Sequence, residues 1–140
     1  MKRSLGKPIL IAATAVIAVS IVIGIVIIGS PTEGRFRQLD SGRIGDLQGI
    51  MRATDLFWSR TDRLPESLEE LAADPRASVR IVDPGTGEPY VYRVTSPDTY
   101  ELCATFDRES RVVPARDAAE FWRHGPGPTC FELEVDKNVR

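Results

Sequence analysis

The sequence predicts an α+β fold, in which an N-terminal transmembrane helix is followed by a small domain of helices and an antiparallel sheet. An uncharged apolar run, an amphipathic helical pattern and several segments of alternating polarity succeed one another along the chain. Helices followed by consecutive strands are typical of the α+β class. We expect four parts: a cytoplasmic N-terminus (1–7), a transmembrane helix (8–29), a juxtamembrane hinge (30–37) and an extracytoplasmic domain (38–140).

The apolar run extends from Ile9 to Ile28. At 1.5 Å per residue, a helix over this run spans about 30 Å, which is the thickness of the hydrocarbon core of a bilayer. Thr14 and Ser20 interrupt the run, but their hydroxyls can bond to carbonyl groups of the same helix. A cleaved secretory signal is the alternative, but its apolar region is shorter, and here Pro31 lies close to the small residues that a peptidase would need. We therefore expect an uncleaved anchor.

Positive charge flanks the run on its N-terminal side, where Lys2, Arg3 and Lys7 occur without any acidic residue. The positive-inside rule then favours a cytoplasmic N-terminus and an extracytoplasmic domain, and we expect the protein at the inner or plasma membrane. The chain has a net charge of −2, and the part after the run is more acidic because these three cations precede it. Such a domain gains nothing from a phosphate backbone, so we expect no nucleic-acid partner. The expected partners are the lipid bilayer, through residues 8–29, and an unknown protein.

A second helix is predicted over about 38–61, where apolar residues recur at three- and four-residue spacing. Asp40 or Ser41 is a candidate for its N-cap. Charged residues fall largely on the other faces, which we expect to be solvated. The apolar positions are Leu39, Ile44, Leu47, Ile50, Met51, Thr54, Phe57 and Trp58, and the polar ones are Arg43, Asp46, Arg52, Asp55 and Ser59.

Residues 64–71 are predicted to open a short helix, with Pro65 in its first turn. It ends at Asp74-Pro75, because the residue before a proline is disfavoured in the helical region. Three or four strands follow, and in the last two of them apolar and polar residues alternate. The predicted strands cover 79–82, 90–94, 99–106 and 129–135. In the irregular stretch 107–128, Phe121 and Trp122 are predicted to enter the core.

The two cysteines of the chain, Cys103 and Cys130, both fall in predicted strands. If these strands are neighbours, the cysteines are near enough to pair, and a disulfide would persist outside the cytoplasm. Closing a loop of this size would contribute about 3–4 kcal/mol in the chain-entropy model. The alternative is two buried free thiols that act as small apolar residues.

No residue pattern predicts a catalytic site, a cofactor site or a metal site, so we do not expect an enzyme. His124 is the only histidine, and one histidine cannot form a zinc shell. The segment 83–88 contains oxygen ligands but lacks the spaced acids of a calcium loop, so a β-turn is expected. Glu66, Glu69 and Glu70 are expected to lie near the positive end of the short helix rather than to act as paired catalytic carboxylates.

The segments LPESLEEL (64–71), DPGTGEPYVYR (83–93) and TYELCATF (99–106), following a membrane helix and an amphipathic helix, resemble pseudopilins of type II secretion. The resemblance covers about residues 36–135, and it extends to small bacterial single-pass proteins that combine an anchor with this domain. It implies a pilin-like fold, in which a long helix packs on a small antiparallel sheet. The pilin leader has Phe-Thr-Leu-x-Glu after its glycine, whereas Gly6 is followed here by Lys7, and the family's acidic metal loop is missing.

We therefore expect a membrane-anchored envelope protein whose extracytoplasmic domain mediates protein–protein contacts. One alternative is a pseudopilin-like subunit of a secretion or pilus-type assembly. A further alternative is a ligand-binding or enzymatic domain without a recognisable motif, with a pocket under the 107–128 stretch.

Overall fold

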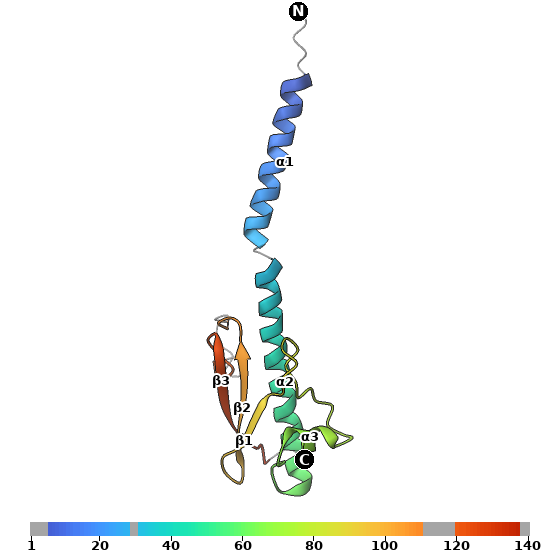
Figure 1. The fold of residues 1–140 in the computed structure, drawn as a ribbon, viewed down its shortest axis with the longest axis vertical. Coiled ribbons are helices and arrows are strands. Elements are labelled where there is room, and N and C mark those ends of the chain that lie inside the picture. Colours follow the sequence, from blue (N-terminus) through green and yellow to red (C-terminus); the bar gives the residue numbers. More distant parts are fainter. Residues whose placement is uncertain (1–5, 29–30, 111–119, 138–140) are drawn as a thin grey trace, which may run out of the picture. The chain divides into compact units, whose positions relative to one another are not determined.

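The computed structural model describes residues 6–28, 31–110 and 120–137. Three helices precede three strands there, which confirms the α+β class (Figure 1). By its internal contacts the chain divides into two units, Met1–Arg35 and Phe36–Arg140. The elements are α1 (Gly6–Ile28), α2 (Pro31–Thr61), α3 (Leu68–Ala73), β1 (Val91–Val94), β2 (Thr99–Phe106) and β3 (Gly127–Glu134).

Helix α1 is long and apolar enough to cross a membrane. Its large side chains are exposed, from 52% at Ile23 to 75% at Val26. Thr14 Oγ1 donates to the carbonyl of Leu10 at 2.9 Å, and Ser20 Oγ donates to the carbonyl of Val16 at 2.8 Å. Both hydroxyls are therefore satisfied within the helix, as a hydrocarbon environment requires. The cations at positions 2 and 3 lie outside the described residues.

Helix α2 begins at Pro31, so the predicted start near residue 38 is wrong, and the described part of the expected hinge, 31–37, is helical. Proline suits a first helical turn because its missing N–H would have no partner there, and Glu33 is favourable near the positive end of the helix. Gly34 within the helix costs only about 1 kcal/mol relative to alanine. Asp40 and Ser41 lie well inside α2, so neither caps it.

Helix α3 begins at Leu68, later than predicted, because Ser67 is its N-cap. The Ser67 side chain accepts a hydrogen bond from the backbone N–H of Glu70 at 3.3 Å. Pro65 precedes the helix and is buried instead of forming its first turn. Asp74 caps the C-terminal end, in agreement with the stop expected at Asp74-Pro75.

The segment 79–82 does not form the predicted strand. Val82 makes an isolated antiparallel bridge with Pro89, and Tyr90 N–H donates to the carbonyl of Ile81 at 2.9 Å. A longer ladder is disfavoured because Pro89 has no N–H to donate. Within the described ranges the sheet therefore has three strands, in the antiparallel order β1-β2-β3.

One face of the sheet forms the hydrophobic core together with α2 and α3. In β2, buried apolar side chains alternate with half-buried or exposed residues, as predicted. The second half of β3 shows the same alternation. Phe121 is 47% exposed, so its predicted place in the core is wrong, whereas Trp122 is buried and packs on Phe131. The core includes Leu47, Ile50, Phe57, Leu68, Leu71, Tyr100, Leu102, Ala104, Phe106, Phe131, Leu133 and Val135.

Candidate functional site

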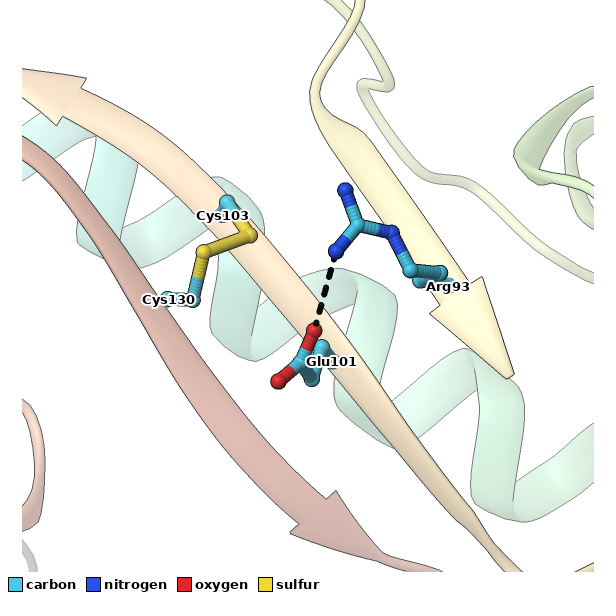
Figure 2. The surroundings of a disulfide bond; sticks show 4 residues. All are labelled: Arg93, Glu101, Cys103 and Cys130. Atoms are coloured by element: carbon cyan, nitrogen blue, oxygen red, sulfur yellow. Dashed lines mark ion pairs between the residues drawn. A yellow bond between two sulfur atoms is a disulfide. The ribbon is translucent and has the colours of Figure 1, made fainter. Parts of the chain in front are cut away.

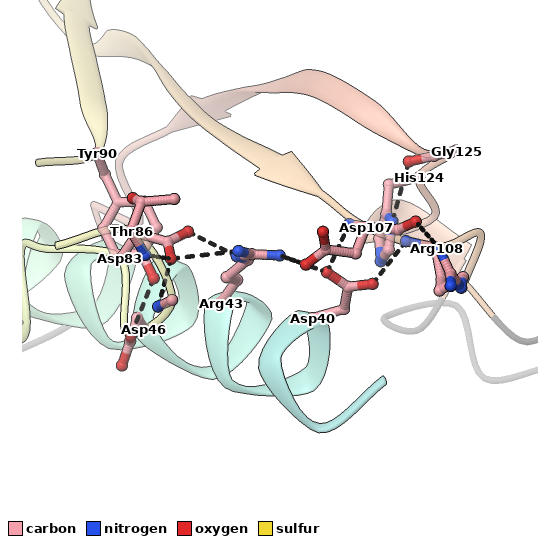
Figure 3. Close-up of polar contacts among 11 residues, drawn as sticks. Asp40, Arg43, Asp46, Asp83, Thr86, Tyr90, Asp107, Arg108, His124 and Gly125 are labelled. Atoms are coloured by element: carbon pink, nitrogen blue, oxygen red, sulfur yellow. Dashed lines mark hydrogen bonds and ion pairs between the residues drawn. The ribbon is translucent and has the colours of Figure 1, made fainter. Parts of the chain in front are cut away.

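A buried arginine of α2 gathers three carboxylates from separate parts of the domain (Figure 3). Arg43 Nε donates to Asp83 Oδ2 at 2.5 Å, and its Nη1 donates to Asp40 Oδ1 at 2.7 Å. The same Nη1 donates to Asp107 Oδ2 at 2.6 Å. We call these four residues the Arg43 cluster. It links α2 to the turn before β1 and to the residues that follow β2.

Backbone groups hold the carboxylates of the Arg43 cluster from their other sides. Asp40 accepts hydrogen bonds from the first two N–H groups after β2, at 2.9 and 2.8 Å. Asp83 Oδ1 accepts from the N–H groups of Gly85 and Thr86, at 2.7 and 3.0 Å. A Cβ at Gly85 would lie 3.0 Å from an Arg43 nitrogen, so this turn approaches the guanidinium closely. Buried ions are tolerated where pairing and hydrogen bonds satisfy them in this way.

The interactions within the cluster favour the charged forms of both Arg43 and Asp83. Burial by itself lowers the pKa of Arg43, but hydrogen bonds to Asp83, Asp107 and Asp40 outweigh burial and raise the pKa. Burial by itself raises the pKa of Asp83, but Arg43 and the turn N–H groups outweigh it and lower the pKa. Arg43 donates its hydrogen bonds to carboxylates inside the domain. We therefore interpret Arg43 as a structural residue and not as a ligand-binding one.

His124 is buried in a stack rather than placed against a nucleophile. Its ring lies 3.6 Å from the ring of Phe106, with 17° between the planes. Its Nδ1 is 3.3 Å from the carbonyl oxygen of Gly125, and its backbone N–H donates to Ser110 Oγ at 3.2 Å. The His124 ring therefore packs on the apolar face that Phe106 offers.

The turn that was considered for calcium uses its acidic oxygens internally. Both oxygens of Asp83 contact Arg43, and one also accepts two backbone N–H groups. Within residues 6–28, 31–110 and 120–137, no three acidic, histidine or cysteine side chains are grouped to hold a metal ion. The segment does form a turn, but Gly87 N–H donates to the Asp83 carbonyl at 2.8 Å, and this i→i+4 bond makes it an α-turn instead of the expected β-turn.

A disulfide joins Cys103 of β2 to Cys130 of β3, with the two Cα atoms 4.0 Å apart (Figure 2). The register of the sheet places the two residues directly opposite each other. Neither cysteine belongs to the hydrophobic core, because both point to the opposite face of the sheet. The alternative of two buried free thiols is therefore wrong.

A shallow, open depression lies where the end of α2 meets the residues after α3. It is lined by Arg60, Thr61, Asp74, Pro75 and Arg76. An ion pair between Arg60 and Asp74 occupies two of its polar groups. This place differs from the pocket expected under the 107–128 stretch, of which residues 111–119 lie outside the described part.

Comparison with protein-family models, curated proteins and solved structures finds no match. A proposal about function therefore has to be based on the structure of this chain alone. Within the described residues, that structure offers an exposed apolar helix, a structural ion cluster and a disulfide on the outer face of the sheet.

Sequence reasoning missed the burial of Arg43 and Asp55, which it placed on solvated faces. Arg43 is 4% exposed and Asp55 is 8% exposed, and Asp55 Oδ1 accepts from the backbone N–H of Asp136 at 3.0 Å. The signal was present in the spacing, because Arg43 stands four residues before Leu47 and seven before Ile50 on one helical face. Because Arg43 is charged, it was assigned to the polar faces in spite of this spacing.

Proposed function

We propose that the chain is a single-pass protein of a bacterial inner or plasma membrane. In this proposal α1 is the transmembrane anchor, the N-terminus is cytoplasmic and the pilin-like domain is extracytoplasmic. The observation that carries the proposal is α1 itself, because a helix of this length and apolarity with exposed side chains is stable in a hydrocarbon environment and not in water.

The disulfide supports the extracytoplasmic placement of the domain. Disulfides form and persist in oxidising compartments such as the bacterial periplasm and the cell surface, and they are rare in a cytosol that keeps thiols reduced. The Cys103–Cys130 bond is partly open to solvent, since Cys130 is exposed, so a reducing cytosol would have access to it.

We propose that the domain makes contacts with another protein near the membrane. The polar groups of the Arg43 cluster and the ring of His124 are engaged inside the domain. Apolar side chains remain on its surface instead, notably on β1, which is an edge strand of the sheet. Val91 and Val94 of β1 are 47% and 45% exposed. An edge strand with such side chains is a recognised place for partner binding.

Site-specific photocrosslinking in intact cells tests this contact. A photoreactive residue is placed at Val91 or Val94 in the full-length protein, and matched control positions are the exposed Ala72 and Ser78. We expect a discrete adduct with a second protein from the β1 positions and none from the controls. Equal, diffuse labelling from all four positions would contradict the proposal.

A pseudopilin-like subunit is the second candidate, favoured by the packing of the long helix α2 on an antiparallel sheet. Mass-spectrometric determination of the mature N-terminus separates the two candidates. The first proposal predicts a chain that retains residues 1–6, whereas a start at Lys7 would favour the assembly subunit. Crosslinks between copies of this chain would favour it as well.

A further inference from the structure

The disulfide lies on the solvent face of the sheet, away from the hydrophobic core (Figure 2). Cys130 is exposed, while Cys103 on the central strand is partly buried. Side chains of the same strands that point the other way, such as Leu102 and Phe131, form the core. Opening the disulfide therefore removes no core contact, and an attacking sulfur reaches Cys130 more readily than Cys103.

Charge on this face is uneven around the disulfide. Glu101 and Glu132 stand opposite each other in the register, each two residues from its strand's cysteine. Residues two apart on a strand lie on one face, about 7 Å from each other. Arg93 Nη1 lies 3.5 Å from Glu101 Oε2 and compensates that charge. The structure gives Glu132 no ion pair among the residues it describes, so a negative charge remains beside Cys130.

We propose that the Cys103–Cys130 disulfide is a thiol-exchange site of the folded domain, attacked at Cys130 by thiols that carry positive charge. The attacking thiolate forms a bond to Sγ of Cys130, and the bond between the two cysteine sulfurs breaks. Cys103 leaves as a thiolate and takes a proton from water. A second thiol of the same donor then displaces Cys130, so the donor dithiol is oxidised to a disulfide and the domain is reduced by two electrons.

The charge of Glu132 selects the partner. A thiolate is negative, so it is repelled as it approaches Cys130 unless nearby positive groups offset that repulsion. The partner is therefore a dithiol protein whose reactive cysteine lies among basic side chains. This inference goes beyond the proposed contact function, and its test does not depend on the orientation of the protein in the membrane.

The test measures reduction of the full-length protein, in a neutral detergent and without denaturant, by three monothiols. Cysteamine is cationic, mercaptoethanol is neutral and mercaptoethanesulfonate is anionic, and each rate is divided by the rate of the same thiol with a neutral small disulfide. We expect the normalised rate of reduction to be highest with the cationic thiol, intermediate with the neutral one and lowest with the anionic one. At low salt this rate should fall about threefold for each unit of positive charge that the thiol loses. In about 1 M salt the differences between the three rates should disappear, because the Debye length is then only about 3 Å.

Two matched variants localise the effect. Glu132→Gln should remove most of the charge preference, whereas Glu134→Gln, which makes the same change two residues farther along β3, should leave most of it. After an acid quench, peptide mapping should find the mixed disulfide on Cys130. Reduction that occurs only at the rate of global unfolding, an unchanged preference in Glu132→Gln, or adducts mainly on Cys103 would each overturn the proposal.

Discussion

Arg43 and Asp55 are two charged residues that α2 buries, and they differ in what compensates their charge. Arg43 has three carboxylate partners. Asp55 accepts one backbone N–H, from Asp136, and burial is the largest influence on its pKa, which is raised. A buried ion is tolerated as long as its partners remain, whereas an uncompensated one costs free energy in its charged form.

Replacing Arg43 by methionine should destabilise the domain by about 3–5 kcal/mol, because it leaves buried carboxylates without their counterion. Denaturant unfolding of the full-length protein in detergent measures this, with Trp58 and Trp122 as fluorescence probes. Arg52→Met on the exposed face of the same helix is the control, and it should change stability by less than about 0.5 kcal/mol. Equal effects of the two substitutions would contradict a structural role for the Arg43 cluster.

The effect of Arg43→Met should also depend on pH. The pKa of Asp83 is lowered below its ordinary 3.8 in the folded protein. Its contribution to stability is therefore present above about pH 4 and is lost as the pH falls through the folded pKa. The stability difference between the native protein and Arg43→Met should narrow in that acid range.

Asp55→Asn should show the opposite dependence on pH. The pKa of Asp55 is raised, so its folded state prefers the protonated form, and this contribution to stability is lost as the pH rises through the folded pKa. Asparagine keeps an oxygen that accepts the Asp136 N–H but carries no charge. The stability of Asp55→Asn relative to the native protein should therefore increase as the pH rises from the ordinary aspartate pKa of 3.8 through the higher folded pKa, which denaturant titrations at each pH measure. A stability difference between Asp55→Asn and the native protein that does not change with pH would contradict burial of the Asp55 charge.

Residue patterns predicted the apolar core well because burial of Leu47, Ile50 and Phe57 follows from helical spacing alone. For Arg43 the spacing indicated the buried face but not the partners that allow a charge there, because those carboxylates lie 40 and 64 residues away in the sequence. A helical wheel contains no information about such distant partners.

At the scale of elements, the disulfide staples the central strand β2 to the edge strand β3 on their outer face. Removing it as Cys103→Ala/Cys130→Ala should cost about 3–4 kcal/mol in the chain-entropy model, given a sequence separation of 27 residues. The fold should persist because the core cluster contains neither cysteine. Native protein reduced with a thiol should unfold at the same denaturant concentration as the variant. Loss of the tertiary near-ultraviolet signal in the variant would show that the disulfide does more than staple two strands.

Elements were predictable where local chemistry decides them. The strand predicted at 99–106 coincides with β2, because alternation over eight residues is a strong signal. The starts of α2 and α3 were misplaced, since a proline starts the first helix and a serine cap starts the second, and both signals were assigned to other positions. The segment 79–82 pairs only through the isolated Val82–Pro89 bridge, although Val79 and Ile81 pack against the core, and apolar composition alone could not distinguish this from a strand.

At the scale of the whole molecule, an exposed apolar helix precedes an α+β domain that contains a disulfide. In the arrangement that we propose, these two features have different surroundings: the helix lies in hydrocarbon, and the disulfide lies in an oxidising aqueous compartment. A single-pass protein with an extracytoplasmic domain has both surroundings at once.

The most direct test of this arrangement is cysteine labelling in intact cells with a membrane-impermeant thiol reagent, before and after reduction and unfolding. The account predicts no labelling at first, followed by labelling of Cys103 and Cys130 once the exterior is reduced and unfolded while the membrane stays intact. Labelling that needs a broken membrane but no reductant would place the domain in the cytoplasm with free thiols, and it would contradict the account.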